Sequence, residues 1–491
     1  MESPERELEL RGDALRDLVG AALERIVRHI DTLPAQPASD LDGAEAVAAA
    51  FDEPLPEAGA PAEALLDRIF GAAVTKGFNT AGPGYLAYIP GGGLPHAAVA
   101  DLVAGAVNRY VGVYTVAPAL ARIEATVIRW LRDLAGFPAG ASGYLATGGS
   151  LANFSAVVTA RAERLPEDFL RGTLYVSDQG HHSIAKAARL AGFPAERVRA
   201  VESDERSRVR LDRLQAAVDE DRRRGLEPFL VVGNAGTTNT GAVDDLGALA
   251  DLAARERLWF HVDAAYGGCF LLTERGRRAL AGIERADTVV LDPHKGLFLP
   301  YGTGAILARD GRALARAHGG AAEYLPSLGD DPERIDFCRI SPELSRGFRG
   351  LRVWLPLMMH GAQAFRRALD EKLDLARLAC AELRRLDGLE IVAGPELSVV
   401  AFRLAPRPDL GLVADALDAA NERLLAAVNA RRRVFLSGTR LRGRFTLRIC
   451  VLSFRTHEDR VHAALDDIRA SIPAALGASY PPTAPPESTF R

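Results

Sequence analysis

The sequence predicts an α/β fold: a large domain with a mostly parallel sheet, followed by a smaller α+β domain. Between about residues 100 and 310, short apolar runs alternate with longer amphipathic segments, and the apolar runs lack the strict alternation of a half-exposed strand. Strands that are apolar on both faces and separated by helices are typical of a parallel sheet between two helical layers. At 491 residues, the chain is also too long for one ordinary core.

Residues 1–80 are expected to form a helical segment that packs on a partner subunit. Proline-rich breaks at 33–37 and 53–56 leave this segment too interrupted for a core of its own. The stretch AGPGYLAYIPGGGLP (81–95) follows and predicts an irregular loop. Such a loop in a compact protein is often functional.

We assign residues 81–375 to the large domain, and four strands are expected within it. Their candidate sequences are GTLYVSD (172–178), PFLVVGNAG (228–236), LWFHVDAAY (258–266) and TVVLDPH (288–294). Ligands of parallel sheets gather at the carboxyl ends of the strands. Asp178, Thr237, Asp263 and Lys295 all lie at or just beyond such an end.

A long helix is expected from about residue 349, with a kink at Pro356. Shorter helix and strand signals follow, and we assign residues 376–476 to the small C-terminal domain. The Pro/Ser/Thr-rich residues 477–491 are expected to be a disordered tail.

Composition excludes several classes of partner. A net charge of −4 gives no electrostatic basis for binding nucleic acid or a membrane surface. No apolar run reaches the roughly 18 residues of a membrane span. The four cysteines show no metal-binding spacing, and the charged N-terminus does not resemble a signal peptide. We therefore expect a cytoplasmic protein without a metal site.

Lys295 is the first candidate for chemistry. Only four of the 60 basic residues are lysines, and Lys295 directly follows a histidine at the end of an apolar strand. Burial is expected to lower the pKa of its amine, which then becomes a nucleophile towards a carbonyl. The alternative is an ordinary lysine in a salt bridge.

Asp263 is the second candidate. A carboxylate at the end of an apolar strand either caps a helix or holds a cationic ring nitrogen, and small residues follow it in HVDAAYGG. A lysine that binds an aldehyde cofactor, with an aspartate at the pyridinium nitrogen, is the arrangement that pyridoxal phosphate requires. In TGGSLAN, Gly149 and Ser150 open a helix, which suits a phosphate but also an ordinary N-cap. His181 or His182 could stack on a planar ring.

Together the motifs TGGSLAN, SDQGHHS, NAGTTNTGAVDD, HVDAAYGG and DPHKG resemble those of the group II pyridoxal-phosphate-dependent amino acid decarboxylases. Their order and approximate spacing agree over about residues 80–365. This family includes aromatic-L-amino-acid, tyrosine, glutamate, cysteine sulfinate and diaminobutyrate decarboxylases. The resemblance implies a fold-type I enzyme with a seven-stranded sheet, pyridoxal 5'-phosphate as cofactor, and a homodimer with its active site at the interface.

The resemblance also implies roles for individual residues. In the catalytic set, Lys295 binds the cofactor, Asp263 faces its ring nitrogen, His181 stacks on the ring, and Tyr324 returns a proton from a mobile loop. The implied cofactor contacts are Gly149 and Ser150 at the phosphate, Thr237 near the cofactor, Ala265 under the ring, and His294 beside the lysine.

The substrate is expected to be an aromatic amino acid such as tyrosine, DOPA or tryptophan, contacted by Tyr85, Tyr88 and Ile89. An acidic or aliphatic amino acid stays open, since Arg109 and Arg122 are near in sequence. Oxidative deamination, transamination or carbon–carbon lyase chemistry on the same cofactor also stays open, as does a non-enzymatic scaffold. Gly296 departs from the aromatic residue or methionine of many relatives, and it predicts a different site wall there.

Overall fold

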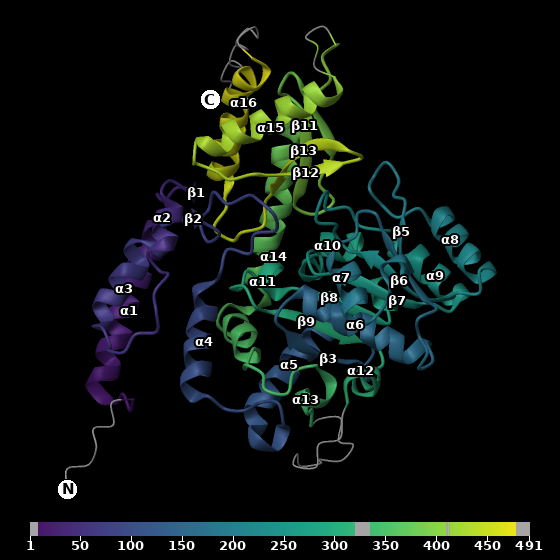
Figure 1. Ribbon diagram of the computed structural model, residues 1–491, viewed down its shortest axis with the longest axis horizontal. Coiled ribbons are helices and arrows are strands. Elements are labelled where there is room, and N and C mark those ends of the chain that lie inside the picture. Colours follow the sequence, from purple (N-terminus) through teal and green to yellow (C-terminus); the bar gives the residue numbers. More distant parts are fainter. Residues whose placement is uncertain (1–7, 320–333, 409–410, 412, 478–491) are drawn as a thin grey trace.

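A seven-stranded sheet forms the centre of the large domain in the computed structural model, which describes residues 8–319, 334–408, 411 and 413–477 (Figure 1). The strand order is β3-β9-β8-β7-β6-β4-β5. Neighbouring strands from β8 to β5 run parallel, whereas β9 is antiparallel to both β8 and β3. The predicted mostly parallel seven-stranded sheet is therefore confirmed. The strands are β3 (Ser142–Ala146), β4 (Gly172–Ser177), β5 (Val198–Val201), β6 (Glu227–Asn234), β7 (Trp259–Ala264), β8 (Thr288–Leu291) and β9 (Gly304–Ala308).

Helices cover both faces of this sheet, as the uninterrupted apolar runs predict. Alternate residues of one strand point to opposite faces. Leu230 and Val232 of β6 pack with α6 and α7, whereas Val231 packs with α8 and α9. The large-domain helices are α5 (Pro118–Leu134), α6 (Gly149–Arg164), α7 (Ser183–Leu190), α8 (Leu211–Arg223), α9 (Leu246–Glu256), α10 (Glu274–Ala279), α11 (Pro293–Gly296), α12 (Gly311–His318) and α13 (Phe337–Ile340), with short 3-10 turns η2 (Tyr114–Val116), η3 (Ala195–Arg197), η4 (Gly268–Leu272) and η5 (Ile283–Arg285).

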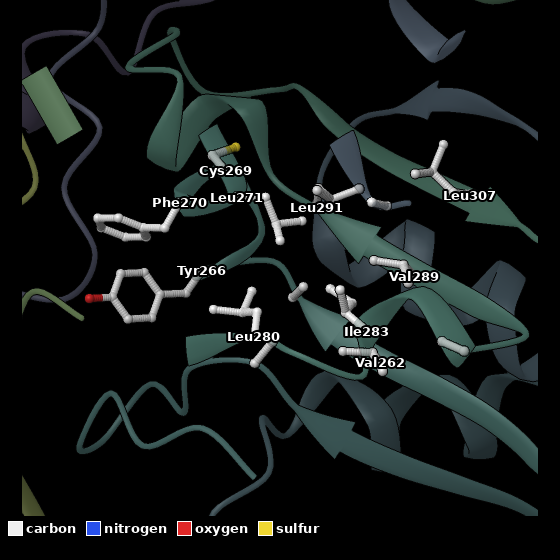
Figure 2. Close-up of a cluster of buried hydrophobic side chains, with 14 of the residues drawn as sticks. Val262, Tyr266, Cys269, Phe270, Leu271, Leu280, Ile283, Val289, Leu291 and Leu307 are labelled. Carbon is white, nitrogen blue, oxygen red and sulfur yellow. The ribbon is translucent and has the colours of Figure 1, made fainter. Parts of the chain in front are cut away.

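Part of the core lies against the strands that carry the candidate residues (Figure 2). Val262 of β7 and Leu291 of β8 belong to the same cluster as Leu271, which comes from η4. Burial of such side chains stabilises the fold by roughly 1.5–3 kcal/mol each. The cluster thus anchors the chain on both sides of Asp263 and immediately before Lys295.

The small domain contains a four-stranded antiparallel sheet of order β10-β11-β13-β12, covered by α15 and α16. Helix α14 (Gly350–Leu383) links it to the large domain. The kink expected at Pro356 is in fact at Gly361, because Gly361 has a non-helical backbone with a positive φ of 70° and ψ of 155°. Glycine adopts this conformation without the steric cost of a Cβ. The elements are β10 (Leu389–Ala393), β11 (Val399–Leu404), α15 (Ala414–Ala430), β12 (Ser437–Leu441), β13 (Arg444–Cys450) and α16 (Glu458–Leu476).

The N-terminal helices stand at one side of the molecule (Figure 1). None of α1 (Gly12–Thr32), α2 (Ala44–Ala49) and α3 (Ala62–Gly71) contains a buried residue. The short strands β1 (Ser39–Asp40) and β2 (Gly77–Phe78) pair, with η1 (Ala73–Thr75) before β2, and α4 (Pro95–Val107) follows. Within the described residues, no helix combines the length and the apolar character that crossing a membrane requires.

Candidate active site

A cavity of about 290 Å³ opens at the carboxyl ends of β6, β7 and β8, next to the first turn of α6. It brings together all eight residues predicted to contact a cofactor. These residues are Gly149, Ser150, His181, Thr237, Asp263, Ala265, His294 and Lys295. They come from five separate stretches of the chain, and the crossover topology of the parallel sheet places those stretches at one edge.

Lys295 lies on the single turn of α11, directly after β8, and its Nζ is 2.9 Å from Oδ2 of Asp292. Burial lowers the pKa of this amine, but the Asp292 carboxylate outweighs burial, so that the pKa is raised overall. The expected lowering of the Lys295 pKa is therefore wrong for the cofactor-free protein. The lysine is in a salt bridge, as the alternative proposed, and it also lines the cavity.

Asp292 is a cavity residue that the sequence interpretation missed. It is buried, and no hydrogen-bond partner of its Oδ1 lies within the described residues. The signal was present in the DPHK motif, where the aspartate comes three residues before the lysine. That spacing places the two side chains on the same side of a helical turn.

The Asp263 carboxylate is buried at the end of β7 and receives two hydrogen bonds. The backbone N–H of Ala265 donates to Oδ1 at 3.1 Å, and Nδ2 of Asn153 donates to Oδ2 at 3.0 Å. The alternative interpretation as a helix N-cap is wrong, because the next helical turn, η4, is capped by Gly267. Two donors fix the position of the Asp263 carboxylate at the cavity wall, where it can pair with a cationic ring nitrogen.

The first turn of α6 provides a cradle for an anion. A helix N-terminus presents backbone N–H groups and the positive end of the helix dipole, which suit a phosphate. A Cβ added to Gly149 would lie 2.9 Å from Oδ2 of Asp292 and 3.1 Å from the Cβ of Ala265. Glycine thus lets the turn lie close to the rest of the cavity, and the site fits a phosphorylated pyridine aldehyde.

Of the two histidines proposed to stack on the ring, His181 lines the cavity. Its Nδ1 accepts a hydrogen bond from the backbone N–H of Ser183 at 3.2 Å and lies 2.8 Å from the Oγ of the same residue. Burial lowers the pKa of His181, so that its ring stays neutral near pH 7. A neutral ring held at one nitrogen can lie flat against a pyridine face.

Two further cofactor candidates, His294 and Thr237, are held by their neighbours. Nδ1 of His294 donates to the carbonyl of Thr303 at 2.6 Å, and burial lowers the pKa of this imidazole. The Oγ1 atoms of Thr237 and Thr240 lie 2.8 Å apart. Both predicted cofactor contacts therefore have fixed orientations before any cofactor binds.

The three predicted substrate contacts do not line this cavity within the chain. Tyr85 is buried with its ring parallel to that of Phe435, at 5.9 Å between centroids, and Ile89 belongs to the large core. Tyr88 is 54% exposed and takes a positive φ of 51°. Tyr324, the predicted proton donor, lies outside the described residues.

Gly296 does not belong to the cavity wall, contrary to the expectation from sequence. A Cβ at this position would lie 2.5 Å from the Cβ of Cys269. Cys269 is buried in η4, behind α11. Gly296, at which this chain differs from many relatives, therefore changes the packing beneath α11, the helical turn that carries Lys295.

Comparison with known proteins identifies the family. Residues 45–405 match the model of the pyridoxal-dependent decarboxylase conserved domain. The chain is 34% identical to an aromatic-L-amino-acid decarboxylase of Bacillus atrophaeus over 96% of its own length and 98% of that protein. It is 35% identical to a cysteine sulfinic acid decarboxylase of Mus musculus over 64% of its length and 65% of that protein.

Solved structures agree with this result. The crystal structure of Oryza sativa TDC with PLP and tryptamine superposes with a TM-score of 0.89 at 27% identity, covering 96% of this chain and 99% of that one. The cavity residues fit the same cofactor, since they place an amine, a carboxylate and a helix N-terminus around one cavity. The chain is therefore a pyridoxal-phosphate-dependent carboxy-lyase and belongs to the family of pyridoxal-dependent decarboxylases.

Proposed function

We propose that this decarboxylase acts on an aromatic L-amino acid, such as tyrosine, DOPA or tryptophan, and releases CO₂ and the corresponding amine. The observation that carries the proposal is the similarity to an aromatic-L-amino-acid decarboxylase along 96% of the chain, against 64–80% for cysteine sulfinic acid decarboxylases and 85% for an L-2,4-diaminobutyrate decarboxylase. The longer match includes the N-terminal segment and the small domain, which lie outside the cofactor-binding core.

The charge of the cavity wall supports an uncharged substrate side chain. No arginine lines the part of the cavity that the structure describes. An acidic side chain would need a dedicated cation, because an unpaired carboxylate is costly to bury. Arg109 is exposed, and the guanidinium of Arg122 lies over the ring of Tyr114, so neither of the arginines proposed for an acidic substrate lines the wall.

Each of the four predicted catalytic residues has a proposed task. Lys295 would bind the cofactor aldehyde, Asp263 would pair with its protonated ring nitrogen, and the imidazole of His181 would stack on the ring and hold its orientation. The bound cofactor supplies an electron sink for the electrons that CO₂ leaves behind. Tyr324 is proposed to return the proton to the substrate Cα. These tasks use fixed charge and orientation.

We propose that the 81–95 loop contacts the substrate from its place beside the lysine turn. The backbone N–H of Leu94 donates to the carbonyl of Phe298 at 2.7 Å, just after Lys295. A Cβ on Gly91 would clash with the carbonyl oxygen of His294. Tyr88, exposed on this loop, is the candidate for reaching a substrate across a subunit interface, while Tyr85 and Ile89 hold the loop in shape.

We infer that the enzyme is a homodimer with its active site at the interface. Helices α4 and α14 pack together and expose a continuous set of large apolar side chains. These are Val99, Leu102, Val103, Val107, Met358 and Met359. Apolar patches of this kind on a folded protein mark an interaction surface.

The four cysteines are all free, which supports the proposed cytoplasmic location.

Light scattering on the purified holoenzyme tests the dimer. Leu102→Arg places a charge in this apolar patch on each subunit and is expected to give monomers. Leu190→Arg, at an equally exposed leucine of α7, serves as the control and is expected to leave the dimer intact. A wild-type protein that is monomeric at micromolar concentration would contradict the inference.

A panel of amino acids scored for released CO₂ tests the substrate. Tyrosine, DOPA and tryptophan are expected to exceed glutamate, cysteine sulfinate and diaminobutyrate in kcat/KM. Identification of the organic product by mass spectrometry is expected to show an amine. A preference for an acidic substrate would refute the proposed substrate class, and an aldehyde or keto acid would refute simple decarboxylation.

A further inference from the structure

A continuous set of buried hydrogen bonds runs from the middle of the sheet to the cavity. His261 is completely buried and lies two residues before Asp263 on β7, so both side chains point to the same face. Nε2 of His261 is 3.0 Å from Oδ1 of Asn153 on α6, and Nδ1 is 3.0 Å from Oγ1 of Thr288 on β8. None of these contacts was anticipated from the sequence.

Asn153 is the branching point of this network. Its Nδ2 donates to Oδ2 of Asp263 at 3.0 Å and to Oγ of Ser183 at 2.9 Å. Ser183 in turn contacts Nδ1 of His181 at 2.8 Å. One buried amide therefore connects the carboxylate at the proposed ring-nitrogen position with the histidine proposed to stack on the ring.

The direction of each hydrogen bond follows from its partners. The Asp263 carboxylate only accepts, so the amide nitrogen of Asn153 must face it and the amide oxygen must face His261. Nε2 of His261 then carries the proton. The indole N–H of Trp259 donates to Oγ1 of Thr288 at 2.9 Å, which leaves the Thr288 hydroxyl hydrogen to donate to Nδ1 of His261.

A neutral His261 with its proton on Nε2 satisfies the bonds to Asn153 and to the Thr288 hydroxyl, whereas the Thr288 carbonyl oxygen, 3.3 Å from Nδ1, receives no proton from this ring. Burial lowers the pKa of His261, which keeps the imidazole neutral. Because Nε2–H is bonded to the amide oxygen, the Asn153 side chain cannot flip without leaving the buried N–H unpaired. An unpaired buried donor is unfavourable, so the observed orientation is the stable one.

We propose that Asn153 and His261 are positioning residues for the cofactor: they orient the Asp263 carboxylate towards the ring nitrogen and, through Ser183, orient the His181 ring. Asn153 lines the cavity but is directed at protein groups, and His261 acts through it without reaching the cavity wall. This role presupposes that Asp263 pairs with the ring nitrogen, as proposed above. A purely structural network would stabilise the fold without distinguishing one cofactor ring from another.

Binding of two cofactors to the apoenzyme distinguishes a positioning role of this network from a purely structural one. Pyridoxal phosphate and its 1-deaza analogue share the aldehyde and the phosphate, but the analogue lacks the ring nitrogen. A charge-assisted hydrogen bond is worth about 1.5–3 kcal/mol, which corresponds to a preference of roughly 10–150-fold for pyridoxal phosphate in the wild type. Dissociation constants from absorbance or fluorescence titration give this preference directly.

Asn153→Leu is expected to abolish most of the preference while leaving the affinity for the deaza analogue within about threefold of wild type. Asn421 serves as a matched control, since it is also completely buried and makes two hydrogen bonds, but in the small domain. Asn421→Leu is expected to lower thermal stability and to retain the preference.

The histidine offers a second test, which also serves if Asn153→Leu does not fold. Glutamine places an N–H near the position of Nε2, whereas asparagine places its amide near Nδ1. His261→Gln is therefore expected to keep the preference, and His261→Asn to lose it.

The possible negative results contradict different proposals. A wild-type enzyme without any preference for pyridoxal phosphate would refute the role of Asp263. A wild-type preference that persists in Asn153→Leu and in His261→Asn would overturn the positioning role, as would an equal loss of affinity for both cofactors.

Discussion

The substitution Gly296→Ala tests whether the residue after the lysine matters through packing. The new Cβ would lie 2.5 Å from the Cβ of Cys269 and 3.3 Å from its Sγ. Ordinary carbon–carbon contacts are about 3.5–4.0 Å, so α11 would have to move by roughly 1 Å. Cys269 lies in the close-packed core and has no room to retreat.

Overpacking of this kind costs about 1–3 kcal/mol. At about 2–4 °C per kcal/mol, the apparent unfolding temperature should fall by roughly 2–12 °C. The displaced turn carries Lys295, so the affinity for the cofactor should fall as well. Gly140→Ala is the control, because no atom lies within 4 Å of a Cβ added there.

Cys269→Gly supplies the second arm of a double-mutant cycle. It removes both the Cβ and the Sγ, after which the nearest atom to a Cβ at position 296 would be the Cα of residue 269 at 3.6 Å. The double variant should be more stable than the sum of the two single losses predicts, with a coupling of about 0.5–3 kcal/mol. Differential scanning fluorimetry on the four proteins gives the comparison. Additive losses, or a Gly296→Ala protein as stable as wild type, would refute the packing explanation.

Three further predictions concern the cavity. Lys295→Ala should abolish both the visible absorbance of bound cofactor and turnover, and persistence of either would contradict the assignment of the lysine. Asp292→Asn removes the carboxylate that favours the Lys295 ammonium, so the pKa of the amine should fall and the apoenzyme should capture pyridoxal phosphate at lower pH than wild type; stopped-flow absorbance across a pH series checks this, and an unchanged profile speaks against it. Gly149→Ala should weaken binding of pyridoxal phosphate at least tenfold, because its Cβ would meet Asp292 and Ala265; equilibrium titration of the apoenzyme decides the point, and wild-type affinity would contradict the cradle.

The central strands could be predicted because they are buried on both faces. β4, β7 and β8 are buried along their whole length, so each reads as a mainly apolar run without alternation between polar and apolar residues. β5 gave no such signal, since it is a four-residue edge strand that includes the half-buried Arg199. β3 and β9 are five residues each and contain glycine and alanine, which do not indicate a strand. The seven-strand count was available only from the resemblance to a family.

The candidate site shows a similar division. Residues next to a strand end, such as Asp263 and Lys295, could be proposed from position alone. Asn153 and His261 could not, because their proposed roles depend on hydrogen-bond partners more than a hundred residues away in the sequence. The burial of the Tyr85 side chain could not be predicted from the sequence either, since an irregular loop has no periodicity that indicates which side chains point inward.

The four lysines show why rarity alone was a weak argument for Lys295. Lys372 is just as rare and is completely buried, yet its Nζ is bonded to a carboxylate oxygen of Glu371 at 2.8 Å and to the carbonyl of Thr456 at 2.5 Å. Burial lowers the pKa of Lys372, so a search for buried lysines with lowered pKa would select it. Lys295 has a raised pKa and would be rejected by the same search.

What distinguishes the two amines is the space around them. Lys295 lines a cavity that also contains a fixed carboxylate and a helix N-terminus, whereas Lys372 is enclosed by its protein partners. A carbonyl compound can approach only the first of these amines. Nucleophilic use of a lysine therefore depends on access and on neighbouring charge together, and the Asp292 carboxylate that raises the Lys295 pKa is itself part of the control over when the amine reacts.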